Sequence, residues 1–430
     1  MPRRSVRVPS VLRTAALLAV VCTLATSAAA QTIEAISFDE AIRRAVTNNP
    51  TMRQAAAGIL RAEALLQQTR AVALPSVNAN LTTSLIGPVP EFAGQNITPR
   101  SQLNTAAGLA VPLVMPVEWA QRHQAADQVV VSQRTADDLR REVAVATAEA
   151  YLAVIALRQV VELNERARDN ARAHFEYAQQ RYEGGLGSRL NALRAQQELS
   201  ADEAVLEEAR LAVRRAQEAL GVLVAADGPI DAASEPTFEA DLAVEGEQPL
   251  IEARSDVRVV LARESAATRV LRDSWREYLP SVTSLFAPQI LTPSGLFAPA
   301  RSWSVSFVAS VPIWEAGERR GRERERRAAL DVVRAERAGL ERQATSEIRT
   351  AREAVRATER ALTSALAGAE QATEVLRITD VAFRAGATTN IEVIDAQRRA
   401  RDAETGAAIV QHSLRRARLE LLVATGRFPR

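Results

Sequence analysis

The sequence contains two very long runs in which almost nothing interrupts a helix. Residues 118–183 contain neither proline nor glycine, and residues 318–385 contain no proline and three glycines. Alanine, arginine, glutamate, glutamine and leucine dominate both runs, and all five favour helix. Each run predicts a helix of roughly 100 Å, because a helix rises 1.5 Å per residue. Such helices cannot fold into a compact globule, so we expect lateral packing as in a coiled coil.

Four short segments have a different pattern and predict β-strands. In the clearest of them, Trp303, Val305 and Phe307 alternate with serines, and alternation of period two indicates a strand. Charged residues are missing around all four, although a quarter of the chain is charged. Strands with one apolar and one small polar face are typical of transmembrane β-barrels, and the pattern leaves open a soluble β-subdomain. The predicted strands are residues 75–86, 102–115, 281–291 and 302–313.

The first 30 residues predict a cleaved signal peptide for export. They contain four arginines and no acid, then an apolar stretch that ends in Ala28-Ala29-Ala30. The only cysteine of the chain, Cys22, lies in this segment without the small residue that a lipid-attachment site needs before it. We therefore predict neither a disulfide nor a lipid anchor. Without the segment, 50 basic residues face 52 acidic ones, so composition gives no support to nucleic-acid binding.

The chain also repeats itself at an offset of 201 residues. Around two glycine-containing turns, Tyr182 corresponds to Phe383 and Gly185 to Gly386. This predicts an internal two-fold repeat with one helical hairpin in each half. The first repeat is expected over residues 31–225 with its hairpin at 118–225, and the second over 251–425 with its hairpin at 317–425. Between them lies an acidic connector over residues 226–250. Its residues 227–247 hold seven acids, two prolines and no arginine, which predicts that they are not helical. Residues 426–430 form a tail.

The order of these elements resembles the TolC-type outer membrane efflux family over residues 37–425. Further likenesses are Leu-Pro before the first and third strands, Ser37-Phe-Asp-Glu-Ala at the start, and Leu-Asn-Ala-Leu-Arg-Ala-Gln and Ile-Glu-Val-Ile-Asp-Ala-Gln after the turns. The resemblance implies a mainly α fold with a transmembrane β-barrel portion. Four strands per chain would close a 12-stranded barrel in a homotrimer, continued by a long periplasmic α-helical barrel, with residues 226–250 in the equatorial region.

The function that the resemblance implies is a passive exit channel in the outer membrane of a Gram-negative bacterium. Such a channel conducts substrates from an inner-membrane pump and a periplasmic adaptor, in tripartite efflux or type I secretion. A different function stays open on the pattern alone, namely a periplasmic coiled-coil structural or adaptor protein without a pore.

The resemblance also assigns three groups of residues. The turns would dock the adaptor, and acids just after the second turn would ring the periplasmic aperture, although the family's acid at position 191 and its arginine near position 388 are absent. Aromatic residues at the junction of strands and helices would lie at the membrane interface. The turn residues are Gly184, Gly185, Leu186, Ser188 and Gly386; the aperture residues are Glu392 and Asp395 with Asn191, Arg194 and Thr388; the interface aromatics are Trp119, Trp275, Tyr278 and Trp314.

Residues that would indicate catalysis are scarce. After the signal peptide the histidines are His123, His174 and His412, none at metal-ligand spacing. The glycines at 184, 185 and 187 are not followed by the lysine of a phosphate-binding loop and come after a helix rather than a strand. We therefore predict no enzymatic activity, no cofactor and no metal site.

Overall fold

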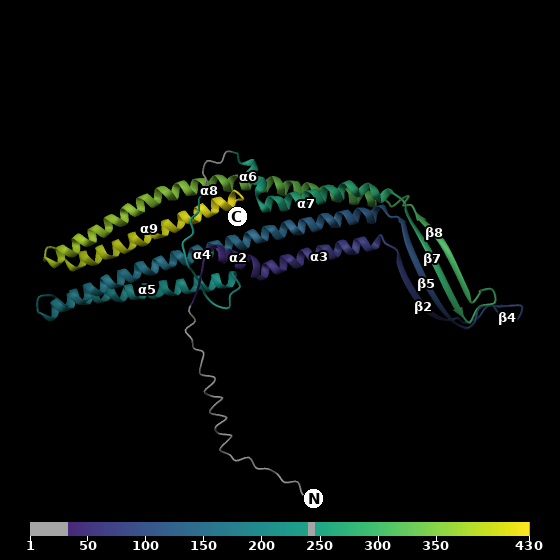
Figure 1. Cartoon of the computed structure of the whole chain (residues 1–430), viewed down its shortest axis with the longest axis horizontal. Helices are drawn as coiled ribbons and strands as arrows, with labels where there is room; N and C mark the ends of the chain where they lie inside the picture. Colours follow the sequence, from purple (N-terminus) through teal and green to yellow (C-terminus); the bar gives the residue numbers. More distant parts are fainter. Residues whose placement is uncertain (1–32, 240–245, 430) are drawn as a thin grey trace, which may run out of the picture.

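The computed structural model describes residues 33–239 and 246–429. The chain is elongated. A wall of long helices extends along most of its length, and a β-sheet forms one end (Figure 1). The predicted signal peptide, including Cys22, lies outside the described residues.

Two helices run along the whole helical wall. They are α4 (Pro116–Glu183), with 68 residues, and α8 (Glu318–Arg384), with 67 residues. Both coincide with the runs free of proline. Shorter helices accompany them: α2 (Phe38–Asn48), α3 (Pro50–Val72), α5 (Arg189–Leu223), α6 (Gln248–Ala253), α7 (Ser255–Arg272) and α9 (Asn390–Ala424).

The shorter helices join end to end, so that each pair continues one line of the wall. Where α5 meets α3, the Asn49 side chain donates to the carbonyl of Leu223 at 2.9 Å and accepts from the N–H of Thr51. Where α9 meets α7, the buried Arg254 donates to the carbonyl of Ala424 at 3.5 Å. These side chains satisfy helix-end groups that would otherwise lack partners.

The wall has the same two edges along its length. Near the hairpin turns the helices follow the order α8, α9, α4, α5, and near the sheet the order α8, α7, α4, α3 (Figure 1). One edge is therefore α8, and the other is α3 continued by α5. We call α4 with α5 the first hairpin and α8 with α9 the second hairpin.

The sheet continues the same arrangement. Four antiparallel strands lie in the order β2 (Ser76–Leu85), β5 (Ser101–Val114), β7 (Ser281–Thr292) and β8 (Arg301–Ser310). The edge strand β2 follows α3 and the edge strand β8 precedes α8, so sheet and wall share their edges. A further small hairpin, β3 (Glu91–Phe92) with β4 (Gln95–Asn96), lies in the loop between β2 and β5.

One strand boundary differs from the sequence prediction by more than a residue. The fourth strand ends at Ser310 and not at Ile313, because its partner β7 begins at Ser281, which pairs with Ser310. Helix α6 begins at Gln248, directly after the residues predicted to lack helix, and Pro249 suits the first turn of a helix. The other three strands differ from their predicted bounds by one residue at most.

A belt crosses the middle of the wall. β1 (Glu34–Ile36) pairs in parallel with β6 (Ile230–Ala232), a pairing that the sequence did not suggest. The fully buried Tyr151 of α4 ties the belt down, since its hydroxyl lies 3.0 Å from the carbonyl oxygen of Ile36 and 2.8 Å from that of Ser234. Phe38 packs edge-on against the Tyr151 ring. The C-terminal tail also belongs to this core, because Phe428 is buried there.

Within the described residues, α4 is the one helix that is long and apolar enough to cross a membrane by length and composition. Its fully buried Tyr151, Leu152 and Val154 pack into the cores beneath the belt. Core packing therefore accounts for part of the apolar stretch of this helix.

Replacing Tyr151 by phenylalanine should loosen the belt. The variant keeps the ring but removes the hydroxyl that lies within hydrogen-bond distance of the carbonyls of Ile36 and Ser234, at a cost of about 1–3 kcal/mol. We expect faster cleavage of the acidic residues 226–250 by a glutamyl endopeptidase, followed by mass spectrometry. Tyr278→Phe, at a half-exposed ring, should leave the rate unchanged, and equal rates in both variants would contradict the assigned role of Tyr151.

Candidate functional site

Both hairpins end in the same turn. In the first, Gly185 has φ 71°, and the N–H groups of Gly185 and Leu186 donate to the carbonyls of Tyr182 and Arg181 at 3.0 and 2.8 Å. In the second, the residues 201 positions later make the same pair of hydrogen bonds, at 3.0 and 2.8 Å, around Gly386 with φ 78°. A left-handed residue with these two bonds ends a helix, and glycine adopts it without strain.

The predicted turn residues lie together at the end of the wall farthest from the sheet (Figure 1). Leu186 points into solvent with 77% of its surface exposed. Ser188 caps α5 by accepting from the N–H of Asn191 at 3.3 Å. Other exposed apolar side chains near the turns are Tyr182, Leu190, Leu193 and Ile391.

The predicted aperture residues all lie on or next to the first turns of α5 and α9. Glu392 and Asp395 are exposed on α9, and Asp395 pairs with Arg399 of its own helix at 3.0 Å. Asn191 and Arg194 lie on α5, and Arg194 is exposed without an ion pair to any described residue. Thr388 is half-buried in the second turn. The predicted aperture therefore carries two exposed acids and one exposed arginine per chain.

A polar contact that the sequence did not reveal joins the two hairpins beside these residues. The buried Asn390 of α9 lies with its Oδ1 2.7 Å from Nε2 of His174 on α4, and its side-chain N–H donates to the carbonyl of Asn191 at 3.3 Å. Burial lowers the pKa of His174, so the neutral ring donates from Nε2. The ring also packs against Phe383.

Two ion pairs continue this contact along α5 and α9. Arg398 donates through Nε to Glu198 at 2.9 Å, and Arg401 pairs with Asp202. Both carboxylates are almost fully buried, and burial raises the pKa of Asp202 in spite of the nearby Arg401. We call this set the hairpin clasp: His174, Glu198, Asp202, Asn390, Arg398 and Arg401. Its sequence signal is weak, because acids four apart and arginines three apart occur on many exposed helix faces.

The four predicted interface aromatics lie where the sheet meets the wall. Trp119 is in the first turn of α4, Trp275 and Tyr278 lie in a 3₁₀ turn before β7, and Trp314 lies between β8 and α8. All four are exposed, Trp314 by 82%.

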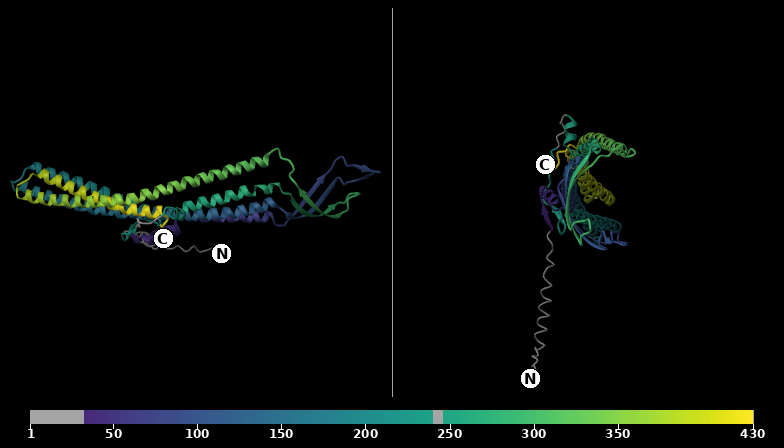
Figure 2. Two further views of the ribbon diagram at one scale, coloured as in Figure 1. Left: turned by 90° about the horizontal axis from the view of Figure 1, so that it is seen from above. Right: turned by 90° about the vertical axis from the view of Figure 1, so that its right-hand side faces the viewer.

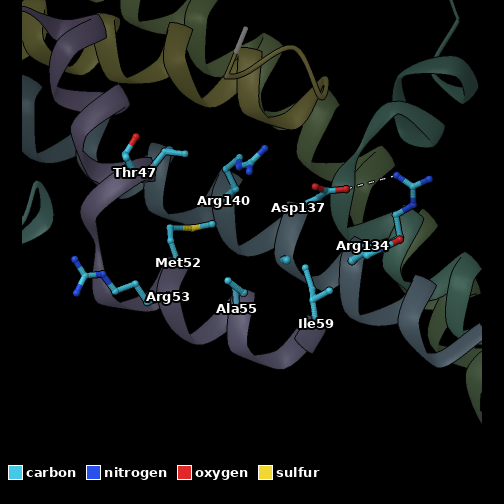
Figure 3. Close-up of a pocket in the computed structure, with 12 residues that line it drawn as sticks. Thr47, Met52, Arg53, Ala55, Ile59, Arg134, Asp137 and Arg140 are labelled. Atoms are coloured by element: carbon cyan, nitrogen blue, oxygen red, sulfur yellow. Dashed lines mark hydrogen bonds and ion pairs between the residues drawn. The ribbon is translucent and has the colours of Figure 1, made fainter. Parts of the chain in front are cut away.

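The wall has a groove between two of its helices. This groove, between α3 and α4 in Figure 3, has a volume of about 580 Å³. Ile59 lies beside the ion pair of Arg134 with Asp137, and Met52 lies nearer Arg140. Across residues 33–239 and 246–429, no three histidine, cysteine or acidic side chains gather closely enough to hold a metal ion.

Solved structures of similar fold are bacterial membrane proteins. A membrane protein from Pseudomonas aeruginosa superposes with a TM-score of 0.80 at 21% identity, over 90% of this chain and 93% of the other. The CmeC outer membrane channel of Campylobacter jejuni gives 0.80 at 14% identity, over 91% and 85%. The open state of the MtrE outer membrane channel of Neisseria gonorrhoeae gives 0.77 at 18% identity, over 90% and 88%.

No curated protein matches the chain. The family of outer membrane efflux proteins matches residues 41–226 and 252–427, which include both hairpins, all four strands of the sheet and every candidate residue described above. The chain therefore belongs to the outer membrane efflux protein family.

Proposed function

We propose that three copies of this chain form a passive exit channel through the outer membrane, built from two repeats of one unit per chain and exported by a signal peptide over residues 1–30. An inner-membrane pump and a periplasmic adaptor deliver the substrate in tripartite efflux or type I secretion. The observation that carries the proposal is the shared edge of sheet and wall, with β2 and α3–α5 on one side and β8 and α8 on the other.

Backbone chemistry favours closure of the sheet. In lipid the free N–H and C=O groups of an edge strand have no water to pair with, so spanning sheets must close. Four strands alternate in direction, which makes β8 of one copy antiparallel to β2 of the next. Three copies joined head to tail give 12 strands, and the same rotation joins α8 to α3 and α5 of the neighbour.

The surface of the sheet argues for lipid around it and against the alternative of a periplasmic coiled-coil protein with a soluble β-subdomain. Over its first eight residues, β5 exposes Leu103 and Ala107, while the polar Gln102 and Asn104 on the other face are less exposed. A soluble sheet would hide the apolar face instead. Val77 and Leu81 of β2 are also more than 70% exposed. The aromatic residues at the junction of sheet and wall then lie at the periplasmic interface of the membrane around the barrel; they are Trp119, Trp275, Tyr278 and Trp314.

At the far end of the wall, the helix turns meet the adaptor and the α9 acids surround the mouth. Three copies contribute six carboxylates from Glu392 and Asp395 and three guanidinium groups from Arg194. Each Asp395 is also paired with Arg399 of its own helix. The hairpin clasp holds the mouth closed. It takes the place of the family's acid at position 191 and arginine near position 388, which this chain lacks. No catalytic step is required of any residue.

Neutralising the acids of the mouth should reduce its preference for cations. A ring of carboxylates attracts cations and repels anions, so we expect the cation selectivity of the native trimer in planar bilayers to fall in Glu392→Gln/Asp395→Asn. Block by divalent or trivalent cations from the periplasmic side should also disappear. Arg194→Gln is the matched control, and it should make the native selectivity stronger. Unchanged selectivity and block in the double variant would place the constriction elsewhere.

Placing a charge on the first turn should uncouple the channel from its adaptor. We expect Leu186→Asp to give trimers of normal abundance that no longer export a fluorescent dye from cells carrying the cognate pump, because the carboxylate cannot be buried in an apolar contact. Leu186→Met keeps the apolar volume and should retain export. Normal export by the aspartate variant would show that this turn is not the adaptor contact.

Breaking the hairpin clasp should favour the open mouth. Glu198→Gln/Arg398→Gln removes a charged hydrogen bond worth about 1.5–3 kcal/mol, which shifts the closed-to-open ratio by roughly tenfold or more. Single-channel recording should show a larger mean conductance. Arg377→Gln breaks the exposed pair with Glu374 and should leave the conductance unchanged. Equal conductance in all three proteins would exclude the clasp as a closing contact.

A further inference from the structure

An apolar stripe lies exposed on the α8 edge near the turns. Val375, Ile378 and Val381 follow one another at three-residue spacing on α8, and each is more than half exposed. Tyr182, at the end of α4 in the first hairpin, is 40% exposed. Several exposed apolar side chains on one edge indicate a surface that a partner covers.

The chain contains an internal precedent for that contact. Tyr177 of the first hairpin packs edge-on against Phe383 of the second hairpin, with ring centroids 5.9 Å apart. The offset of 201 residues that relates the two turns carries Tyr177 onto Ile378 and Phe383 onto Tyr182. The equivalent contact therefore joins Ile378 of a second hairpin to Tyr182 of a first hairpin.

The two residues belong to opposite sides of one chain. Ile378 lies on α8, the edge of the wall, and the first hairpin of the same chain already packs against the other side of the second hairpin. The first hairpin that receives Ile378 must then come from a second copy. We propose that, near the turns, Val375, Ile378 and Val381 of one copy pack against Tyr182 of the next and form an apolar seam; this rests on the proposed ring of three copies.

The seam lacks the first ion pair of the clasp. The same offset carries Glu198 onto Arg399 and Arg398 onto Gln197. Arg399 already pairs with Asp395 of its own helix at 3.0 Å, and glutamine carries no charge. Within a chain this contact is an ion pair. Between chains, the residue that faces Arg399 is the uncharged Gln197, so no ion pair can form there.

The second ion pair also has no counterpart. The offset carries Asp202 onto Ala403 and Arg401 onto Ser200. A ring of three chains has six contacts between neighbouring hairpins, and the two kinds alternate. The three contacts within chains are held by directional ion pairs, and the three contacts between chains are apolar. Apolar contacts are non-directional, so the seam allows neighbouring chains to slide during opening while the clasp of each chain must break.

Engineered cysteines test the seam directly in the full-length trimer. The first variant carries Ile378→Cys and Tyr182→Cys in a Cys22→Ser background. A second, independent variant carries Val375→Cys and Arg189→Cys in the same background. Val375 and Arg189 are the counterparts of His174 and Asn390, which contact each other within one chain. Mild oxidation should shift the denatured protein from monomer to covalent dimer and trimer on a non-reducing gel, and a reductant should reverse the shift. Disulfides form only where two Cα atoms approach within about 7 Å.

The matched control is Leu366→Cys/Tyr182→Cys. Leu366 is an equally exposed apolar residue of α8, but it lies 12 residues, or about 18 Å, away from Ile378 along the helix, so its band should stay at the monomer position. Chemical cross-linking of the unmodified protein establishes the trimer separately. A trimer whose seam cysteines do not link, or link no better than the control, would overturn the seam alone, whereas the absence of a trimer would overturn the proposed function.

Discussion

Lateral packing on α4 is the interaction on which the rest of the structure depends. This one helix contacts α3 and α7 towards the sheet, α5 and α9 towards the turns, and α2 with the belt between them. Small residues make the close approach possible, since Ala144 and Ala148 are fully buried in its middle. Because so many helices pack against α4, it determines where each of them lies. The positions of the strands and the turns follow from those helices.

The same packing decides what stays uncovered. Helices at the centre of the wall bury both sides, but α8 has neighbours on one side only, and α3 with α5 forms the opposite edge. Figure 2 shows that the wall and the sheet curve together when seen along the chain. A curved wall with two free edges has the geometry of one segment of a ring, which is why the proposed function follows from the edges rather than from a pocket.

The candidate site combines rigid turns with a polar lock. Glycine turns hold Leu186 in solvent, while His174, Asn390 and two buried ion pairs hold the hairpins of one chain together. Charged hydrogen bonds require defined geometry, so they suit a contact that has two states. The apolar seam proposed between chains makes no such demand.

The sequence by itself determined the long helices, the four strands and the turns, because each depends on local signals: the absence of proline, alternation of period two, and glycine where φ must be positive. Through the repeat, the sequence also placed Gly185, Gly386, Glu392 and Asp395 at or beside the two hairpin turns, at one end of the helical wall. Only the tertiary structure decided that Glu198 meets Arg398, that Asn390 meets His174, and that β1 pairs with β6. Those contacts join residues far apart in the chain, and their choice depends on which helix faces pack together, which local pattern does not encode.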